Sequence, residues 1–108
     1  MKHSIASVCL SGNLKQKIEA AAAAGFRGIE IFENDLLLYD ASPAVVRRIA
    51  EDNNIDIIAL QPFRDFECMP RQNMKKNYDR AERKFDTMAE LNTDTLLICS
   101  NVSPACVD

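Results

Sequence analysis

The stretch Ser42–Gln61, SPAVVRRIAEDNNIDIIALQ, contains a complete helix followed by a complete strand. Ser42 is a preferred N-cap residue, and Pro43 suits the first helical position, where no backbone N–H is needed. The pair Asn53-Asn54 ends the helical pattern. The residues from Ile55 onward are almost continuously apolar, which is typical of a strand covered on both faces. The stretch therefore predicts a helix that returns the chain to a buried strand.

The same unit occurs on both sides of this stretch. Alternation of strands and helices predicts a parallel sheet whose strands are joined by right-handed crossovers. The chain thus has the order β-α-β-α-β-α-β, and its class is α/β. The other predicted elements are a strand at 4–10, a helix at 14–24 that Gly25 ends, a strand at 27–32, a loop or short turn at 33–41, a loop at 62–73, a helix at 74–91 and a strand at 93–100.

Helical spacing predicts which side chains of the first and third predicted helices, at 14–24 and 74–91, are buried. Leu14, Ile18 and Ala21 or Ala22 form an apolar stripe on the first helix. The stripe predicted for the third helix consists of Tyr78, Ala81, Phe85, Met88 and Leu91. The charged run RAERK at 80–84 is interpreted as a solvated face.

Two architectures use this βα unit, an open doubly wound sheet and an eight-stranded barrel. The first turn after a strand is SGN at 11–13, which lacks the glycine-rich patterns of dinucleotide-binding and P-loop proteins. Spacing alone leaves both architectures open. Four strands correspond to half of a barrel.

Composition indicates an ordinary globular domain. The chain has 108 residues, of which 47% are hydrophobic and 27% are charged. The net charge of −3 argues against non-specific nucleic-acid binding. No secretory or membrane-spanning pattern occurs, so a cytoplasmic location without membrane contact is expected. The four cysteines include no CxxC pair; they are interpreted as reduced, packed side chains, with a disulfide or reactive thiol as the alternative.

Ligands of parallel α/β proteins bind where the carboxyl ends of the strands meet. Glu33 and Asp35 follow the second predicted strand, and Gln61 and Arg64 follow the third. The guanidinium of Arg64 suits a carboxylate or phosphate on a substrate. Pro62 and the phenylalanines beside it, at 63 and 66, are expected to stiffen and anchor this segment.

Each of these candidates also has a structural interpretation. Arg64 could form a surface ion pair with Asp65 or Glu67. Glu33 and Asp35 could be loop caps or turn formers. Glu30 could point into a barrel or lie at a sheet edge. No catalytic triad and no metal cluster can be assembled from these segments.

Three motifs carry a resemblance to a known family: IEIFENDLLLYD at 29–40, LQPFRDFE at 60–67 and LLICSNVSP at 96–104. The sequence resembles the start of bacterial 3-dehydroshikimate dehydratases, which belong to the sugar-phosphate isomerase/epimerase, or xylose isomerase-like, barrel superfamily. The resemblance implies a partial (β/α)8 TIM barrel, with 1–108 as its N-terminal half: roughly the first four strands and three helices. Some members carry a second domain resembling 4-hydroxyphenylpyruvate dioxygenase.

The resemblance also implies a reaction. Members of that family remove water from 3-dehydroshikimate to give protocatechuate, in quinate and shikimate catabolism, with a divalent metal such as Mg²⁺ or Mn²⁺. Arg64 matches the arginine expected to face the substrate, and Glu33 and Gln61 match positions at the same barrel mouth. The family's metal ligands and catalytic residues lie in later segments. We therefore expect no catalytic residue and no bound metal in this chain, and no activity from it alone.

Two other functions stay open on the sequence. One is a sugar-phosphate isomerase or epimerase of the same superfamily. The other is a non-catalytic half-barrel that associates with itself, because an unclosed barrel exposes strand edges.

Overall fold

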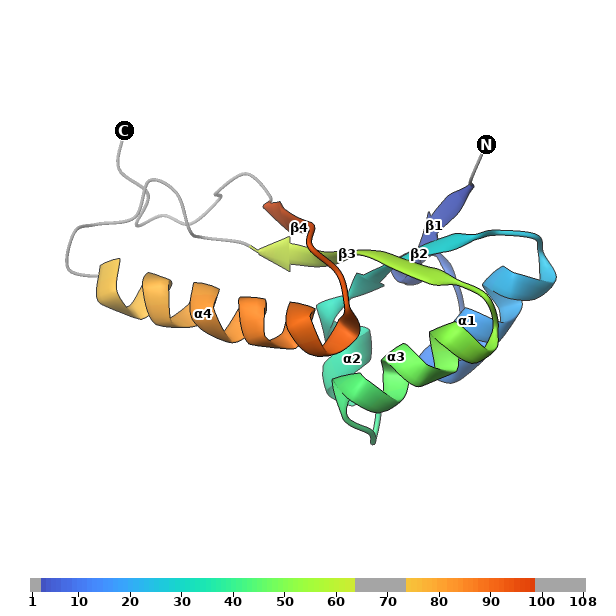
Figure 1. The fold of residues 1–108 in the computed structure, drawn as a ribbon, viewed down its shortest axis with the longest axis horizontal. Coiled ribbons are helices and arrows are strands. Elements are labelled where there is room, and N and C mark those ends of the chain that lie inside the picture. The colour runs from blue at the N-terminus through green and yellow to red at the C-terminus, as the bar shows by residue number, and fades with distance from the viewer. Residues whose placement is uncertain (1–2, 64–73, 99–108) are drawn as a thin grey trace.

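The structure, a computed structural model, describes residues 3–63 and 74–98. Its elements follow the predicted β-α alternation, with two short helices, η1 and α2, more than expected (Figure 1). In chain order they are β1 (Ser4–Ala6), the 3-10 helix η1 (Ser7–Cys9), α1 (Leu14–Ala23), β2 (Gly28–Phe32), α2 (Glu33–Leu38), α3 (Pro43–Asp52), β3 (Asp56–Phe63), α4 (Met74–Leu91) and β4 (Leu96–Ile98).

The four strands form one parallel sheet in the order β1-β2-β3-β4. Ile5 of β1 pairs with Ile29 of β2, which in turn pairs with Ile57 of β3. A register shift follows, so that Ile31 of β2 lies opposite Leu60 of β3. Since the strand order never reverses, each crossover of the same hand places its helix on the same side of the sheet.

Figure 1 shows that α1, α2, α3 and α4 lie on one face of the sheet. A doubly wound sheet carries helices on both faces, whereas a barrel carries them only outside. The fold is therefore part of an α/β barrel, as the resemblance implied. The expectation that β3 is covered on both faces is wrong for the described residues, since Ile58 is 37% exposed.

The predicted helix ends are confirmed at three places. Asn13 accepts a hydrogen bond from the Gln16 N–H at 2.9 Å, and the Gln16 side chain accepts from the Asn13 N–H, which completes a capping box. The Ser42 side chain accepts from the Val45 N–H at 3.4 Å, with Pro43 at the start of α3. Gly25 follows α1 with φ +92°, a conformation that a side chain disfavours.

One apolar core lies between the sheet and the helices. Ile29 and Ile31 on β2 are fully buried, and so are Ile18 on α1 and Val46 on α3. The predicted stripe of α1 is confirmed, with Ala21 rather than Ala22 in the buried position. The remaining members of the core include Leu14, Leu36, Ala50, Ile55, Ile57, Leu60, Met88 and Leu91.

Two expected segments have a different local structure. The first strand ends at Ala6 instead of residue 10, because Ser7–Cys9 turns into a 3-10 helix. The expected loop at 33–41 contains the helix α2. Glu33 and Asp35 lie in its first turn, where negatively charged carboxylates interact favourably with the positive end of the helix dipole.

The third strand is longer than expected, because Pro62 and Phe63 belong to β3 rather than to the following loop. The peptide bond between Gln61 and Pro62 is cis. Phe63 is 1% exposed, so the expectation that it packs inward is confirmed. Phe66 lies outside the described residues.

Helix α4 has the predicted bounds but a different buried face. Ala81, Met88 and Leu91 are buried as expected, whereas Tyr78 and Phe85 are each 56% exposed. Tyr78 follows Asn77 and Phe85 follows Lys84, and both Asn77 and Lys84 face inward. One position along a helix corresponds to a rotation of about 100°, which turns each aromatic side chain away from the core. Lys84 faces inward because its ammonium contacts Glu33 and the Phe63 ring, and this orientation leaves Phe85 on the exposed side.

The expectation that the cysteines are packed is wrong for Cys9, which is a free thiol on the exposed surface of η1. Cys9 is exposed because β1 ends at Ala6 and the chain then forms the 3-10 helix Ser7–Cys9. The other three cysteines lie outside the described residues.

The core predicts a large difference between two substitutions. Ile31→Ala should lower the free energy of unfolding by about 2–5 kcal/mol, because it opens a cavity at a fully buried position. Leu38→Ala, at a residue 86% exposed, should change it by less than about 0.5 kcal/mol. Urea unfolding followed by circular dichroism measures both, and equal effects would contradict this packing.

Candidate functional site

The face of the sheet opposite the helices corresponds to the interior of a barrel. Glu30 lies on this inner face, because its neighbours Ile29 and Ile31 are buried on the helix side. It pairs with Ala6 of β1 and Ala59 of β3, whose small side chains flank it. Since β2 is an internal strand, the alternative that Glu30 lies at a sheet edge is excluded.

The next row of the inner face holds the predicted site residue Gln61. It pairs with Phe32 of β2, two residues beyond Glu30, at the carboxyl end of the sheet. Both side chains are half-buried. Gln61 thus presents an amide, which can donate and accept hydrogen bonds, where ligands of this fold class bind.

Glu33, the second predicted site residue, begins α2 directly after β2. Both of its carboxylate oxygens accept hydrogen bonds from the Nζ of Lys84 on α4. The side chains of Glu33 and Lys84 are 26% and 13% exposed. The carboxylate of Glu33 is therefore held against α4, whereas Gln61 lies on the inner face.

The third predicted site residue, Arg64, lies outside the described residues. Phe63, directly before it, packs against α4. The guanidinium carbon of Arg80 lies 4.9 Å from the centre of the Phe63 ring, and the Nζ of Lys84 lies 5.6 Å from it. The interpretation of RAERK as a solvated face is therefore wrong for Arg80 and Lys84, because the Phe63 ring attracts both cations inward and the Glu33 carboxylate also attracts Lys84.

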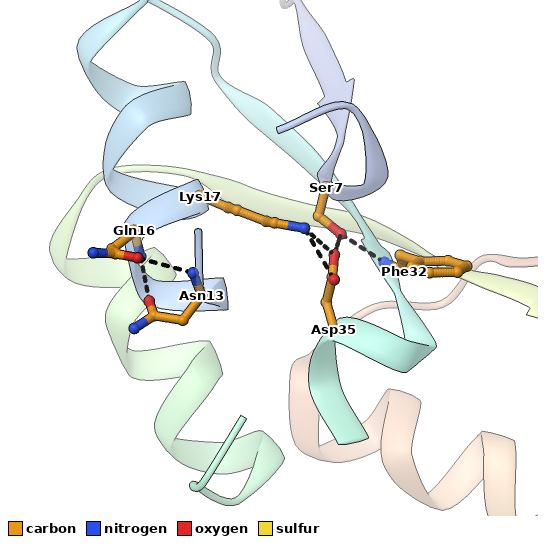
Figure 2. Close-up of polar contacts among 6 residues, drawn as sticks. All are labelled: Ser7, Asn13, Gln16, Lys17, Phe32 and Asp35. Atoms are coloured by element: carbon orange, nitrogen blue, oxygen red, sulfur yellow. Dashed lines mark hydrogen bonds and ion pairs between the residues drawn. The ribbon is translucent and has the colours of Figure 1, made fainter. Parts of the chain in front are cut away.

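A second polar cluster lies beneath the carboxyl ends of β1 and β2 (Figure 2). The Nζ of Lys17 on α1 is 2.9 Å from each oxygen of Asp35 on α2. Ser7 of η1 donates to Asp35 Oδ2 at 2.7 Å and accepts from the Phe32 N–H at 2.9 Å. Lys17 is 7% exposed and Ser7 is fully buried, so this network is shielded from water.

The network fixes four elements to one another: η1, α1, β2 and α2. Asp35, which the sequence offered as a ligand-binding or capping carboxylate, has its charge balanced by Lys17. The sequence analysis missed Lys17 and Ser7. One signal was present, since Lys17 lies between Leu14 and Ile18 on the buried side of α1 and a lysine there needs a counter-charge.

The carboxylates near the strand ends do not converge. Glu30 is on the inner face, Glu33 points to α4 and Asp35 points to α1. Within 3–63 and 74–98, no group of three or more His, Cys, Asp and Glu side chains is placed to hold a metal ion. The described residues therefore do not fit the divalent metal that the family resemblance implies, and we assign no metal ligand to them.

No helix in the described part of the chain is long and apolar enough to cross a membrane.

This geometry, with a sequential parallel sheet and helices outside, agrees with the comparisons to known proteins. Residues 18–107 match the family described as xylose isomerase-like TIM barrel. The match covers most of the sequence, so the chain belongs to this family.

Two curated relatives make the similarity more specific. The chain is 59% identical over 103 residues to a 3-dehydroshikimate dehydratase of Pseudomonas aeruginosa, and 61% identical over 102 residues to one of Pseudomonas putida. These matches cover 95% and 94% of the chain but 16% of each relative. The resemblance noted from the three motifs is thereby confirmed.

A solved structure shows the same similarity in three dimensions. It is a xylose isomerase-like TIM barrel/4-hydroxyphenylpyruvate dioxygenase fusion protein, 58% identical, with a TM-score of 0.96. The superposition covers 99% of this chain and 17% of that protein. The chain therefore spans about a sixth of the length of its relatives.

Substitution of Asp35 tests the buried network. Asp35→Asn leaves the ammonium of Lys17 buried without a counter-charge, and we expect it to lower the free energy of unfolding by about 3–5 kcal/mol. Asp40→Asn, at an exposed residue of the same segment, should change it by less than about 0.5 kcal/mol. Chemical denaturation measures both variants.

Removal of both charges provides the control for this experiment. The double variant Lys17→Met with Asp35→Asn should recover part of the lost stability, since no unpaired charge is then buried. A double variant less stable than Asp35→Asn alone would contradict this account of the network.

Proposed function

We propose that this chain is the N-terminal part of a 3-dehydroshikimate dehydratase, which converts 3-dehydroshikimate to protocatechuate and one water. The observation that carries the proposal is the 59–61% identity to two proteins of that name over nearly the whole chain. The same observation favours dehydration over the isomerase or epimerase alternative. Quinate and shikimate catabolism, a cytoplasmic location and a dependence of the whole enzyme on Mg²⁺ or Mn²⁺ belong to the proposal.

In this proposal the chain contributes substrate binding. The substrate carries a carboxylate, a ketone and hydroxyl groups. Arg64 follows β3 by one residue, and its guanidinium would bind the carboxylate through two parallel hydrogen bonds. Gln61, on the inner face of the same strand, would donate to a carbonyl or accept from a hydroxyl.

Glu33 has a different place in the proposal. Glu33 directly follows Phe32, the residue of β2 that pairs with Gln61, so Glu33 belongs to the same rim of the barrel as Gln61. Its carboxylate is already occupied by Lys84. Through that pair Glu33 would shape the rim and keep its negative charge from repelling the substrate carboxylate.

Dehydration requires loss of a proton next to the ketone and departure of a hydroxyl group, which together remove one water. A further proton shift, from a ring carbon to the ketone oxygen, then makes the ring aromatic. A base must take the proton and an acid must assist the leaving hydroxyl. We assign neither role to the described residues. The chain's own part is to orient the ring, which fixes the proton relative to groups supplied by the remainder of the enzyme.

A chimaera tests the assignment. This chain would replace the matching segment of the Pseudomonas aeruginosa relative, and protocatechuate formation from 3-dehydroshikimate would be followed by absorbance. We expect an active chimaera. In it, Arg64→Met should lower kcat/KM by at least about 30-fold, because the substrate carboxylate loses its charged partner.

Two further variants control for a general effect of charge. Arg64→Lys should recover only part of kcat/KM, since an ammonium cannot make the two parallel hydrogen bonds. Arg83→Met, which removes an exposed positive charge from α4, should leave kcat/KM within about twofold. A correctly folded but inactive chimaera would overturn the proposed function.

The isolated 108-residue chain should form no protocatechuate, with or without added Mg²⁺ or Mn²⁺. Its described residues supply four of the eight strands of a barrel, and the proposal places the metal ligands elsewhere. The same absorbance assay measures this, and turnover by the purified chain would contradict it.

A further inference from the structure

Lys84 is a partly buried cation near the middle of α4. Its side chain is 13% exposed. Its ammonium donates to both carboxylate oxygens of Glu33 and lies 5.6 Å from the centre of the Phe63 ring. Within the part of the chain that the structure describes, these two residues supply the polar and aromatic contacts of its head group.

The two partners belong to the ends of neighbouring strands. Glu33 follows the last residue of β2, and Phe63 is the last residue of β3. Lys84 comes from neither strand but from α4, 51 residues beyond Glu33. A single side chain thus connects the carboxyl ends of β2 and β3 to the helix that covers them.

Gln61 lies between these two attachments. It is two residues before Phe63 on β3, and it pairs with Phe32, the residue before Glu33. The register between the strands shifts at this end of the sheet: Leu60 pairs with Leu96, but the next pair is Phe63 with Ile98. Regular strand pairing on the β4 side is therefore interrupted between Leu60 and Phe63, where Gln61 lies.

Arg80 strengthens the attachment from one turn earlier on α4. Its guanidinium carbon lies 4.9 Å from the centre of the same Phe63 ring, and it donates to Asn77 Oδ1 at 3.2 Å. Phe63 is 1% exposed, so its ring is shielded from water where it contacts these cations. Arg83, between Arg80 and Lys84 in sequence, is exposed and provides a natural control.

We propose that Lys84 is a positioning residue for substrate binding. It holds the ends of β2 and β3 in a fixed relation through Glu33 and Phe63, and so keeps the Gln61 amide aimed at the substrate without touching the substrate itself. This inference rests on the proposed dehydratase function. It assigns to α4, on the outside of the barrel, a role in the chemistry of the inner face.

The chimaera described above provides the test. Lys84→Met removes the charge but keeps the length of the side chain, and we expect kcat/KM for 3-dehydroshikimate to fall about 10- to 100-fold, as misplaced binding groups do. Lys84→Arg should restore most of it. A groove of about 330 Å³ beside Lys84, lined also by Leu37, Arg83 and Thr87, leaves room for the larger head group.

Two readouts separate positioning from simple stabilisation. Substitution of a purely stabilising residue would lower the folded fraction but leave kcat and KM per folded molecule unchanged, whereas substitution of a positioning residue lowers kcat/KM per folded molecule. Glu33→Gln should cause a similar loss, and the double variant Glu33→Gln with Lys84→Met should be little worse than either single variant, because both disrupt one interaction. Arg83→Met should have no effect.

Amide hydrogen exchange of the peptide spanning β3 gives a readout that needs no activity. In Lys84→Met, amides at the end of β3 should exchange at least about tenfold faster than in Arg83→Met. If the parent chimaera is inactive but Lys84→Met still exchanges faster than Arg83→Met, the result counts against the dehydratase function and not against the structural attachment by Lys84. An active parent whose Lys84→Met variant has unchanged kcat/KM per folded molecule, or unchanged exchange, would overturn the role of Lys84.

Discussion

The structure depends on one constraint, the alternation of side chains along the strand β2. Ile29 and Ile31 must be buried against the helices, and this requirement forces Glu30 onto the opposite face. Because the strands follow one another in order, every helix packs on the same side and every strand ends at the same rim. The inner face and its rim, where Gln61 lies, are consequences of burying the outer face.

Charges inside the helical layer hold that rim together. Both carboxylates in the first turn of α2 are paired with lysines from other helices, Asp35 with Lys17 and Glu33 with Lys84. A buried ammonium is costly without a partner, so each pair fixes the distance between its two elements. The short helix α2 is thereby fastened on one side to α1 and on the other side to α4.

This arrangement separates residues that a sequence places side by side. Polar residues clustered after a strand are natural candidates for a binding site, yet Glu33 and Asp35 have structural partners and Gln61 lies on the inner face. Membership of the xylose isomerase-like barrel family and the identity to dehydratases connect that inner face to a substrate. Lys84 links the two sides, since it contacts the strand ends from outside the barrel.

The sequence by itself determined the order of the elements, the bounds of α3 and α4, the stop at Gly25 and the family, because caps, helical periodicity and motifs are local signals. Spacing alone left the barrel and the open sheet unresolved, the resemblance implied the barrel, and no pattern predicted the helix in ENDLLL. Only the tertiary structure decided that Lys17 and Lys84 face inward, while Tyr78 and Phe85 remain exposed. The physical reason is distance along the chain: the partners of these lysines lie 18 and 51 residues away, and no local pattern records such a contact.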